Sequence, residues 1–130
     1  MLERLFILKR TEIFRDLPES VLISLAEYLE DVHLEGGEVL FKQGDVSKSI
    51  YVVVSGAVRI HAGDATRTIM VPNDVFGERS ALTGEVHSTS ATAEEDTELL
   101  RLDEDLLYEV MAGNATISRS IIEVLLERFQ

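Results

Sequence analysis

The chain has 130 residues, 45% of them hydrophobic and none of them cysteine, and its 12 Lys and Arg stand against 24 Asp and Glu for a formal net charge of -12. This composition indicates one globular domain with a real core and excludes disorder, a disulfide framework and a zinc–thiolate site, and it fits a reducing compartment. So acidic a chain repels nucleic acid, and we predict that this domain does not bind it. No apolar run is long enough to span a bilayer, and no signal peptide is recognisable. We therefore predict a cytoplasmic domain that does not insert into a membrane.

Residues 1–31 are predicted to be helical. Apolar residues recur from Leu2 to Leu8, which predicts a helix over Met1–Arg15. Pro18 suits the first turn of a second helix, whose apolar residues are spaced so that they bury one face. These residues are Val21, Leu22, Leu25, Ala26 and Leu29.

The pattern changes at Val32, and residues 32–103 are predicted to form many short strands. Ser49–Ser55 is strongly strand-like because its residues are β-branched or aromatic. Ala57–Ala62 alternates, with Val58 and Ile60 on one face. Further strands are predicted at residues 39–41, 66–71, 88–93 and 97–102, with glycine or proline turn signals between them. This spacing favours a compact β-sandwich or jelly-roll barrel.

Helical periodicity returns over residues 104–130. Asp103 is expected to cap a helix that Gly113 ends, and Asn114 is expected to cap a last helix that reaches Gln130. The last helix carries an apolar band that is wider than one packing stripe requires. Its members are Ile117, Ile121, Ile122, Val124, Leu125, Leu126 and Phe129. We expect this band either to pack closely on the barrel or to contact a second copy of the chain or a neighbouring domain.

The segment Val75–Ala93 has the features of an anion-binding loop. Gly77 lets the backbone approach a ligand, and a short helix is predicted to begin directly after it. The backbone N–H groups and the dipole of such a helix suit a phosphate. Glu78 offers a carboxylate that can accept a hydrogen bond from a sugar hydroxyl.

No catalytic or metal-binding constellation is recognisable. Ser80 and Ser88 lack a histidine–acid partner at a recognisable turn, so a serine nucleophile is not expected. Glu78 and Glu85 are not obviously convergent, and the histidines lack metal-ligand spacing. We therefore do not expect an enzyme.

In this order the elements resemble the cyclic nucleotide-binding domain family, over nearly the whole chain. Residues 34–45, LEGGEVLFKQGD, are similar to the first glycine-punctuated hairpin of the family. Residues 49–60, SIYVVVSGAVRI, are similar to its central strand pair, and residues 75–93, VFGERSALTGEVHSTSATA, to its phosphate-binding cassette. The resemblance implies one domain over residues 1–130, with N-terminal helices, an eight-stranded jelly-roll barrel that holds a short helix, and two C-terminal helices.

The resemblance also implies a role for several cassette residues. Gly77 matches the glycine whose backbone meets the cyclic phosphate, and Glu78 matches the glutamate that binds the ribose 2′-hydroxyl. Ser80 lies in the short helix whose N–H groups face the phosphate. Ser88 matches a position that often touches the phosphate or the base.

Three cassette positions depart from the family pattern. His87 stands where ligand-binding members have an arginine, Arg79 stands where an aliphatic residue is usual, and Val86 replaces a common proline. A charge-assisted hydrogen bond from an arginine contributes roughly 1.5–3 kcal/mol, so its loss weakens binding roughly ten- to a hundredfold. A protonated histidine would recover part of that loss, and Arg79 would help if its side chain turned inward.

Two functions from different classes remain as hypotheses. The first is a regulatory sensor that binds cAMP or cGMP weakly, or binds another small anion, at Gly77–Ser88. Its C-terminal helices would shift on binding and act as a lid. The alternative is a degenerate cassette that binds no nucleotide and serves, within a larger protein or a homo-oligomer, as an interaction module through the last helix. Transcription factors of the catabolite-activator type also resemble the chain, but they carry a helix-turn-helix after the long helix, and this sequence contains none.

Overall fold

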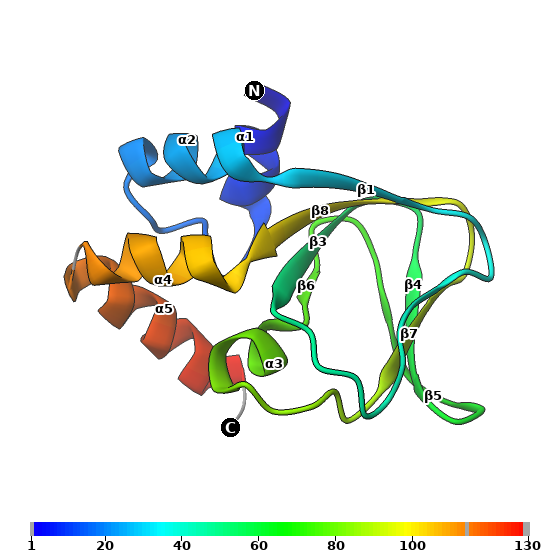
Figure 1. The fold of residues 1–130 in the computed structure, drawn as a ribbon. Helices are drawn as coiled ribbons and strands as arrows, with labels where there is room; N and C mark the ends of the chain where they lie inside the picture. The colour runs from blue at the N-terminus through cyan, green and yellow to red at the C-terminus, as the bar shows by residue number, and fades with distance from the viewer. Residues whose placement is uncertain (1, 114, 129–130) are drawn as a thin grey trace.

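The computed structural model describes residues 2–113 and 115–128, and it places a group of helices beside a body of strands (Figure 1). The helices are α1 (Leu2–Arg10), α2 (Glu19–Tyr28), α3 (Glu78–Thr83), α4 (Glu104–Ala112) and α5 (Ala115–Arg128). The strands are β1 (Glu30–Leu34), β2 (Val39–Phe41), β3 (Ser49–Ser55), β4 (Val58–Ala62), β5 (Ala65–Met70), β6 (Val75–Phe76), β7 (Ser90–Ala93) and β8 (Thr97–Asp103). Figure 1 shows α3 at one end of the strands, with α1, α2, α4 and α5 grouped on the other side of it.

The strands form two antiparallel four-stranded sheets, in the orders β1-β8-β3-β6 and β2-β7-β4-β5. Apart from the β4–β5 hairpin, paired strands are far apart in the chain, so that Glu30 lies opposite Arg101 and Ser49 lies opposite Asp103. No pairing among the described strands joins one sheet to the other, so side-chain packing holds the two sheets together. The prediction of an eight-stranded jelly roll with flanking helices is confirmed, with the barrel built as two facing sheets.

Strand β3 lies at the centre of this arrangement and is buried on both faces. Ile50 and Val52 pack into a core that includes the helices, whereas Tyr51 and Val53 pack into a second core that includes residues of both sheets. This double burial explains why the strand reads as a continuous apolar run and not as an alternating one. By contrast, β4 alternates as predicted, with Val58 and Ile60 buried.

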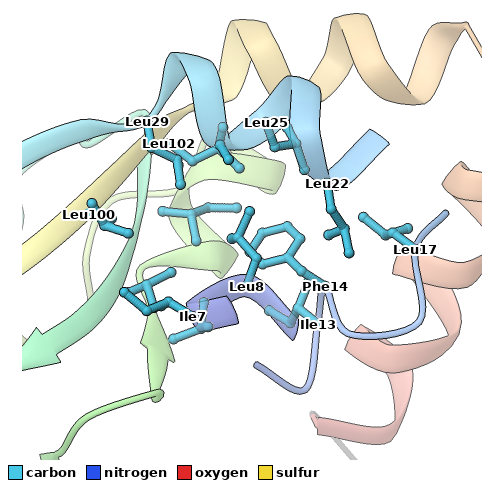
Figure 2. Packing of buried hydrophobic residues seen from close by; sticks show 14 of the residues in the cluster. Ile7, Leu8, Ile13, Phe14, Leu17, Leu22, Leu25, Leu29, Leu100 and Leu102 are labelled. Carbon is cyan, nitrogen blue, oxygen red and sulfur yellow. The ribbon is translucent and has the colours of Figure 1, made fainter. Parts of the chain in front are cut away.

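The larger core fills the space between the helices and the β1-β8-β3-β6 sheet. Leu8 and Phe14 are fully buried at its centre, and Figure 2 shows them side by side, with Leu22 from α2 and Leu102 from β8 around them. Burial of each such leucine stabilises the fold by about 1.5–3 kcal/mol relative to exposure. The N-terminal helices are therefore part of the core and not an appendage.

Several predicted boundaries need correction, and two of them shift by one residue, since β4 begins at Val58 and β5 covers Ala65–Met70. The first helix ends at Arg10 and not at Arg15, because Thr11 Oγ1 donates to the carbonyl of Leu8 and accepts from the backbone N–H of Phe14, which forms a turn. The first strand begins at Glu30, two residues before the predicted change at Val32.

The seventh strand begins at Ser90 and not at residue 88, because the preceding loop pairs with residues 44–45 instead of with β4. Asp103 occupies the cap position of α4, but no cap bond is made by its side chain. Its carboxylate accepts a hydrogen bond from Ser49 Oγ over 2.8 Å. That bond fixes the start of α4 to the start of β3.

The last helix shows both buried and exposed apolar residues. Ile117 is buried, whereas Ile122 and Leu126 are exposed. The side chains of Ile121, Val124 and Leu125, and the whole of Asn114 and Phe129, lie outside the described residues. Among the described helices, none has the length and apolar character that a bilayer crossing requires.

Candidate functional site

The predicted cassette begins where β6 ends at Phe76 and α3 follows. Gly77 joins them with a φ of 84°, in the left-handed region. A Cβ at this position would lie 3.0 Å from the carbonyl oxygen of Ser49, on the neighbouring strand β3. Glycine is thus required both by the turn and by the close approach of β3.

A cavity of about 360 Å³ opens beside α3. It is lined by Phe41, Ile60, Met70, Phe76, Gly77, Glu78, Arg79, Ser80, Glu85, Val86, His87, Ser88 and Thr89. Its volume lies within the range of about 300–1,000 Å³ that is usual for small-molecule sites. All six residues that the sequence singled out, from Gly77 to Ser88, are among the lining residues.

Glu78 and Ser80 lie in the first turn of α3, and both are buried. Only 5% of the surface of Glu78 is exposed, and burying a carboxylate is costly unless polar groups surround it, so this side chain is placed for hydrogen bonding and not for solvation. Ser88 differs because it is exposed where it lines the cavity.

His87 is buried in the wall of the cavity, with only 5% of its surface exposed. Its ring stacks on Phe41, with centroids 3.6 Å apart and planes inclined by 7°. Its Nδ1 shares a hydrogen bond of 3.1 Å with Ser80 Oγ, and its buried Nε2 has no hydrogen-bond partner within the described part of the chain.

The loop between β2 and β3 holds the backbone of His87. The N–H of His87 donates to the carbonyl of Asp45, and its own carbonyl accepts from the N–H of Gly44, each over 2.8 Å. Burial lowers the pKa of His87, and the carboxylate of Asp45 opposes part of that shift. The lowered pKa favours the neutral imidazole, whose ring forms part of the cavity wall.

Arg79 and Glu85 lie at the exposed edge of the cavity. Arg79 Nε is 3.5 Å from Glu85 Oε2, and 67% and 61% of the two side chains are exposed. The sequence did not suggest that Glu78 and Glu85 converge, yet both line this one cavity. Glu85 is tied to a cation there, which does not suit an acid–base pair.

The apolar floor of the cavity was not predicted as part of the site. Phe41, Ile60, Met70 and Phe76 come from four different strands of the two sheets. The alternation of β4 predicted that Ile60 faces inward, and that is the signal which could have found it. Phe41, Met70 and Phe76 line the cavity because of the way in which the two sheets face each other, and the residue pattern within one strand does not predict that arrangement.

A direct bond joins the cassette to the C-terminal helices. The hydroxyl of Tyr108, on α4, donates to the carbonyl of Leu82 over 3.0 Å, and it lies 3.4 Å from the carbonyl of Ala81. Both carbonyls belong to α3. The side chain of Tyr108 thus connects α3 directly to α4.

The remaining histidines make local bonds on the strands. His33 Nδ1 lies 2.6 Å from Glu98 Oε1, and His61 bonds to Thr92 Oγ1 and to the carbonyl of Gly63. Within the described ranges, no three His, Cys, Asp or Glu side chains are grouped so that they could hold a metal ion.

The family model described as "Cyclic nucleotide-binding domain" matches residues 31–114. The chain belongs to this family. Cyclic nucleotide-binding domains are regulatory and not catalytic, in agreement with the interpretation that the chain is not an enzyme.

Two curated relatives of this cyclic nucleotide-binding domain are regulators of different kinds. The chain is 31% identical to the CRP-like cAMP-activated global transcriptional regulator of Mycobacterium tuberculosis, over 95% of this chain and 58% of that protein. It is 32% identical to the cAMP-dependent protein kinase regulatory subunit of Dictyostelium discoideum, over 74% of this chain and 32% of that protein. The chain thus spans less than two thirds of these relatives.

Solved structures agree with the fold of the domain. The Thermus thermophilus catabolite activator protein superposes with a TM-score of 0.79 at 27% identity, over 92% of this chain and 58% of that one. The N-terminal domain of a transcriptional regulator from Streptomyces coelicolor gives a TM-score of 0.84 at 23% identity, over 95% of this chain and 89% of that one.

Proposed function

We propose that this domain is a regulatory sensor that binds cAMP or cGMP, weakly, in the cavity beside α3. One observation carries the proposal: the cassette residues that the family uses for its ligand line a cavity of about 360 Å³. Relatives of both kinds are named for cAMP, which supports this class of ligand.

The proposed roles follow from position in the cavity. The carboxylate of Glu78, which lies in the buried wall, accepts a hydrogen bond from the ribose hydroxyl. The backbone at Gly77 approaches the cyclic phosphate. Ser80 and Ser88 add hydroxyl groups on either side. The neutral His87 adds no charge, which is why the expected affinity is low.

The signal is proposed to leave the site through α3 and α4. Binding that shifts α3 changes the hydrogen bond from Tyr108 to the carbonyl of Leu82, and α4 leads directly into α5. If the C-terminal helices exchange between two arrangements, the ligand shifts the equilibrium toward the arrangement to which it binds more tightly.

Calorimetric titration of cAMP and cGMP into the domain tests the proposal. We expect micromolar to millimolar binding that weakens by about tenfold in Glu78→Gln, because a neutral amide oxygen replaces the charged acceptor of a buried hydrogen bond. His87→Arg, which restores the family cation, is expected to tighten it. Absence of heat at millimolar ligand for both the natural chain and His87→Arg would contradict the proposal.

The pH dependence of this titration reports on His87. A phosphate contact from a protonated His87 would tighten binding as the pH falls from about 7.5 to about 6. Because burial lowers the pKa of His87, we expect little change over that range. Strong tightening would mean that the imidazole turns out of its stack on Phe41 when ligand arrives.

One observation favours a second function, an interaction module. Ile122 and Leu126 are 49% and 63% exposed and lie one turn apart on α5, where they form an apolar strip. A partner domain or a second copy would cover such a strip. Sedimentation of the natural chain and of Ile122→Ser/Leu126→Ser tests this: association that the substitutions abolish supports it, and a monomer at high concentration contradicts it. A cytoplasmic location and the absence of nucleic-acid binding by this domain stay predictions.

A further inference from the structure

The cavity lacks a cation at the position where His87 stands. Less than 1 Å² of its Nε2 is exposed, its Nδ1 is engaged by Ser80, and its ring lies flat on Phe41. The ring can therefore reach a ligand only after breaking both the stack and the hydrogen bond. If the proposed function holds, a positively charged partner for the phosphate has to come from a residue other than His87.

Arg79 is the one lysine or arginine among the described residues that line the cavity. Like the buried Glu78, which precedes it on α3, Arg79 lines the cavity. Because 67% of its side chain is exposed, its three-carbon stem can turn toward the cavity without unpacking the core.

Glu85 holds Arg79 in the unliganded domain. Arg79 Nε lies 3.5 Å from Glu85 Oε2, and both side chains are largely exposed. Exposed ion pairs of this kind typically favour the paired arrangement over the separated one by only about one- to fivefold. A cyclic phosphate carries one negative charge, as Glu85 does, but it can accept two short parallel hydrogen bonds from the guanidinium, which is a closer contact than the 3.5 Å approach of Arg79 Nε to Glu85 Oε2. Glu85 also lines the cavity, so its own charge repels an anion there.

We propose that Arg79 is the phosphate-binding cation of this domain and that Glu85 competes with the ligand for it. Binding exchanges the Arg79–Glu85 ion pair for an Arg79–phosphate contact. The inference rests on the proposed function, because it takes the cyclic nucleotide as the ligand. In the family pattern, the arginine that binds the phosphate stands at the position of His87, whereas here the proposed arginine is on α3.

Titration of cAMP and cGMP into matched charge variants tests the competition. Arg79→Gln is expected to weaken binding by about tenfold or more, since a charge-assisted contact is lost. Glu85→Gln is expected to tighten binding by about two- to fivefold, since a competitor and a like charge are removed. In Arg79→Gln/Glu85→Gln the gain from the second substitution is expected to shrink, because no guanidinium is left to release.

The controls come from a similar pair elsewhere. Arg119 Nε lies 3.2 Å from Glu123 Oε1 within α5, both side chains are exposed, and neither residue lines the cavity. Arg119→Gln and Glu123→Gln make the same changes in net charge and are expected to leave affinity unchanged. Circular dichroism and the unfolding temperature confirm that each variant is folded.

The outcomes separate the two proposals. If the natural chain binds nucleotide and Arg79→Gln binds no worse than Arg119→Gln, the role of Arg79 is overturned while the sensor function stands. If Glu85→Gln binds no tighter than Glu123→Gln, the competition is overturned. If neither the natural chain nor His87→Arg binds, the sensor function fails and the role of Arg79 fails with it.

Discussion

At the scale of single residues, two histidines of this domain have opposite surroundings. His33 is exposed and bonded to Glu98, and this hydrogen bond raises its pKa. His87 is buried, and desolvation lowers its pKa. We expect an NMR titration to find the pKa of His33 above the ordinary value of about 6.5 and that of His87 below it.

The matched variant for this titration is Glu98→Gln. It removes the partner of His33 and is expected to bring the pKa of His33 down toward its ordinary value, because the charged acceptor is gone. The pKa of His87 is expected to stay where it is. A His33 resonance that titrates identically in both proteins would show that the hydrogen bond is absent in solution.

The same shifts give the free energy of unfolding a pH dependence of known sign. The raised pKa of His33 contributes stability below about pH 6.5 that is lost as the pH rises through its folded pKa. The lowered pKa of His87 contributes stability above about pH 6.5 that is lost as the pH falls through its folded pKa. His87→Gln is therefore expected to flatten the acid side of a urea-unfolding series.

Gly77 is expected to tolerate no side chain. Gly77→Ala places a Cβ 3.0 Å from the Ser49 carbonyl at a φ of 84°, and we expect it to cost about 1–3 kcal/mol of unfolding free energy. Gly63→Ala is the control, because its φ is 57° and nothing lies within 4 Å of the added Cβ. It is expected to cost about 1 kcal/mol. Equal losses in chemical denaturation would show that contact with β3 contributes nothing.

At the scale of elements, the bond between α3 and α4 is the simplest route from the cavity to the C-terminal helices. Tyr108→Phe keeps the ring and removes the hydroxyl that donates to Leu82. We expect a loss of about 0.5–1 kcal/mol in stability and smaller ligand-induced amide shifts in α4. Tyr28→Phe, at an exposed position of α2, makes the same chemical change as a control. Undiminished shifts in α4 would place the coupling elsewhere.

Elements with a strong local residue pattern were predictable from the sequence, and boundaries that depend on contacts were not. Ser49–Ser55 matches β3 because β-branched residues fill a doubly buried strand. The end of α1 was missed because it depends on the side-chain bonds of Thr11. The cassette residues were found by motif, but the burial of His87 depends on Phe41 and on the loop at Gly44, which lie over 40 positions away in the sequence.

At the scale of the whole molecule, net charge sets the background for any anionic ligand. A formal charge of -12 repels a nucleotide over distances of about one Debye length, whereas a contact with Arg79 acts at short range and is screened less. We therefore expect nucleotide affinity to increase modestly, by less than about threefold, when salt is raised from about 20 to about 300 mM. Titrations at the two salt concentrations check this. A fall in affinity would mean that local attraction dominates.

Strand β3 ties the two cores into one cooperative unit. Ile50 and Val52 belong to the core with the helices, and Tyr51 and Val53 belong to the core between the sheets. Release of either layer would expose one face of this strand to water and remove about half of its apolar burial. The slowest-exchanging amides of β3 should therefore report the global unfolding free energy, with no stable fragment that keeps a barrel after its helical layer has melted.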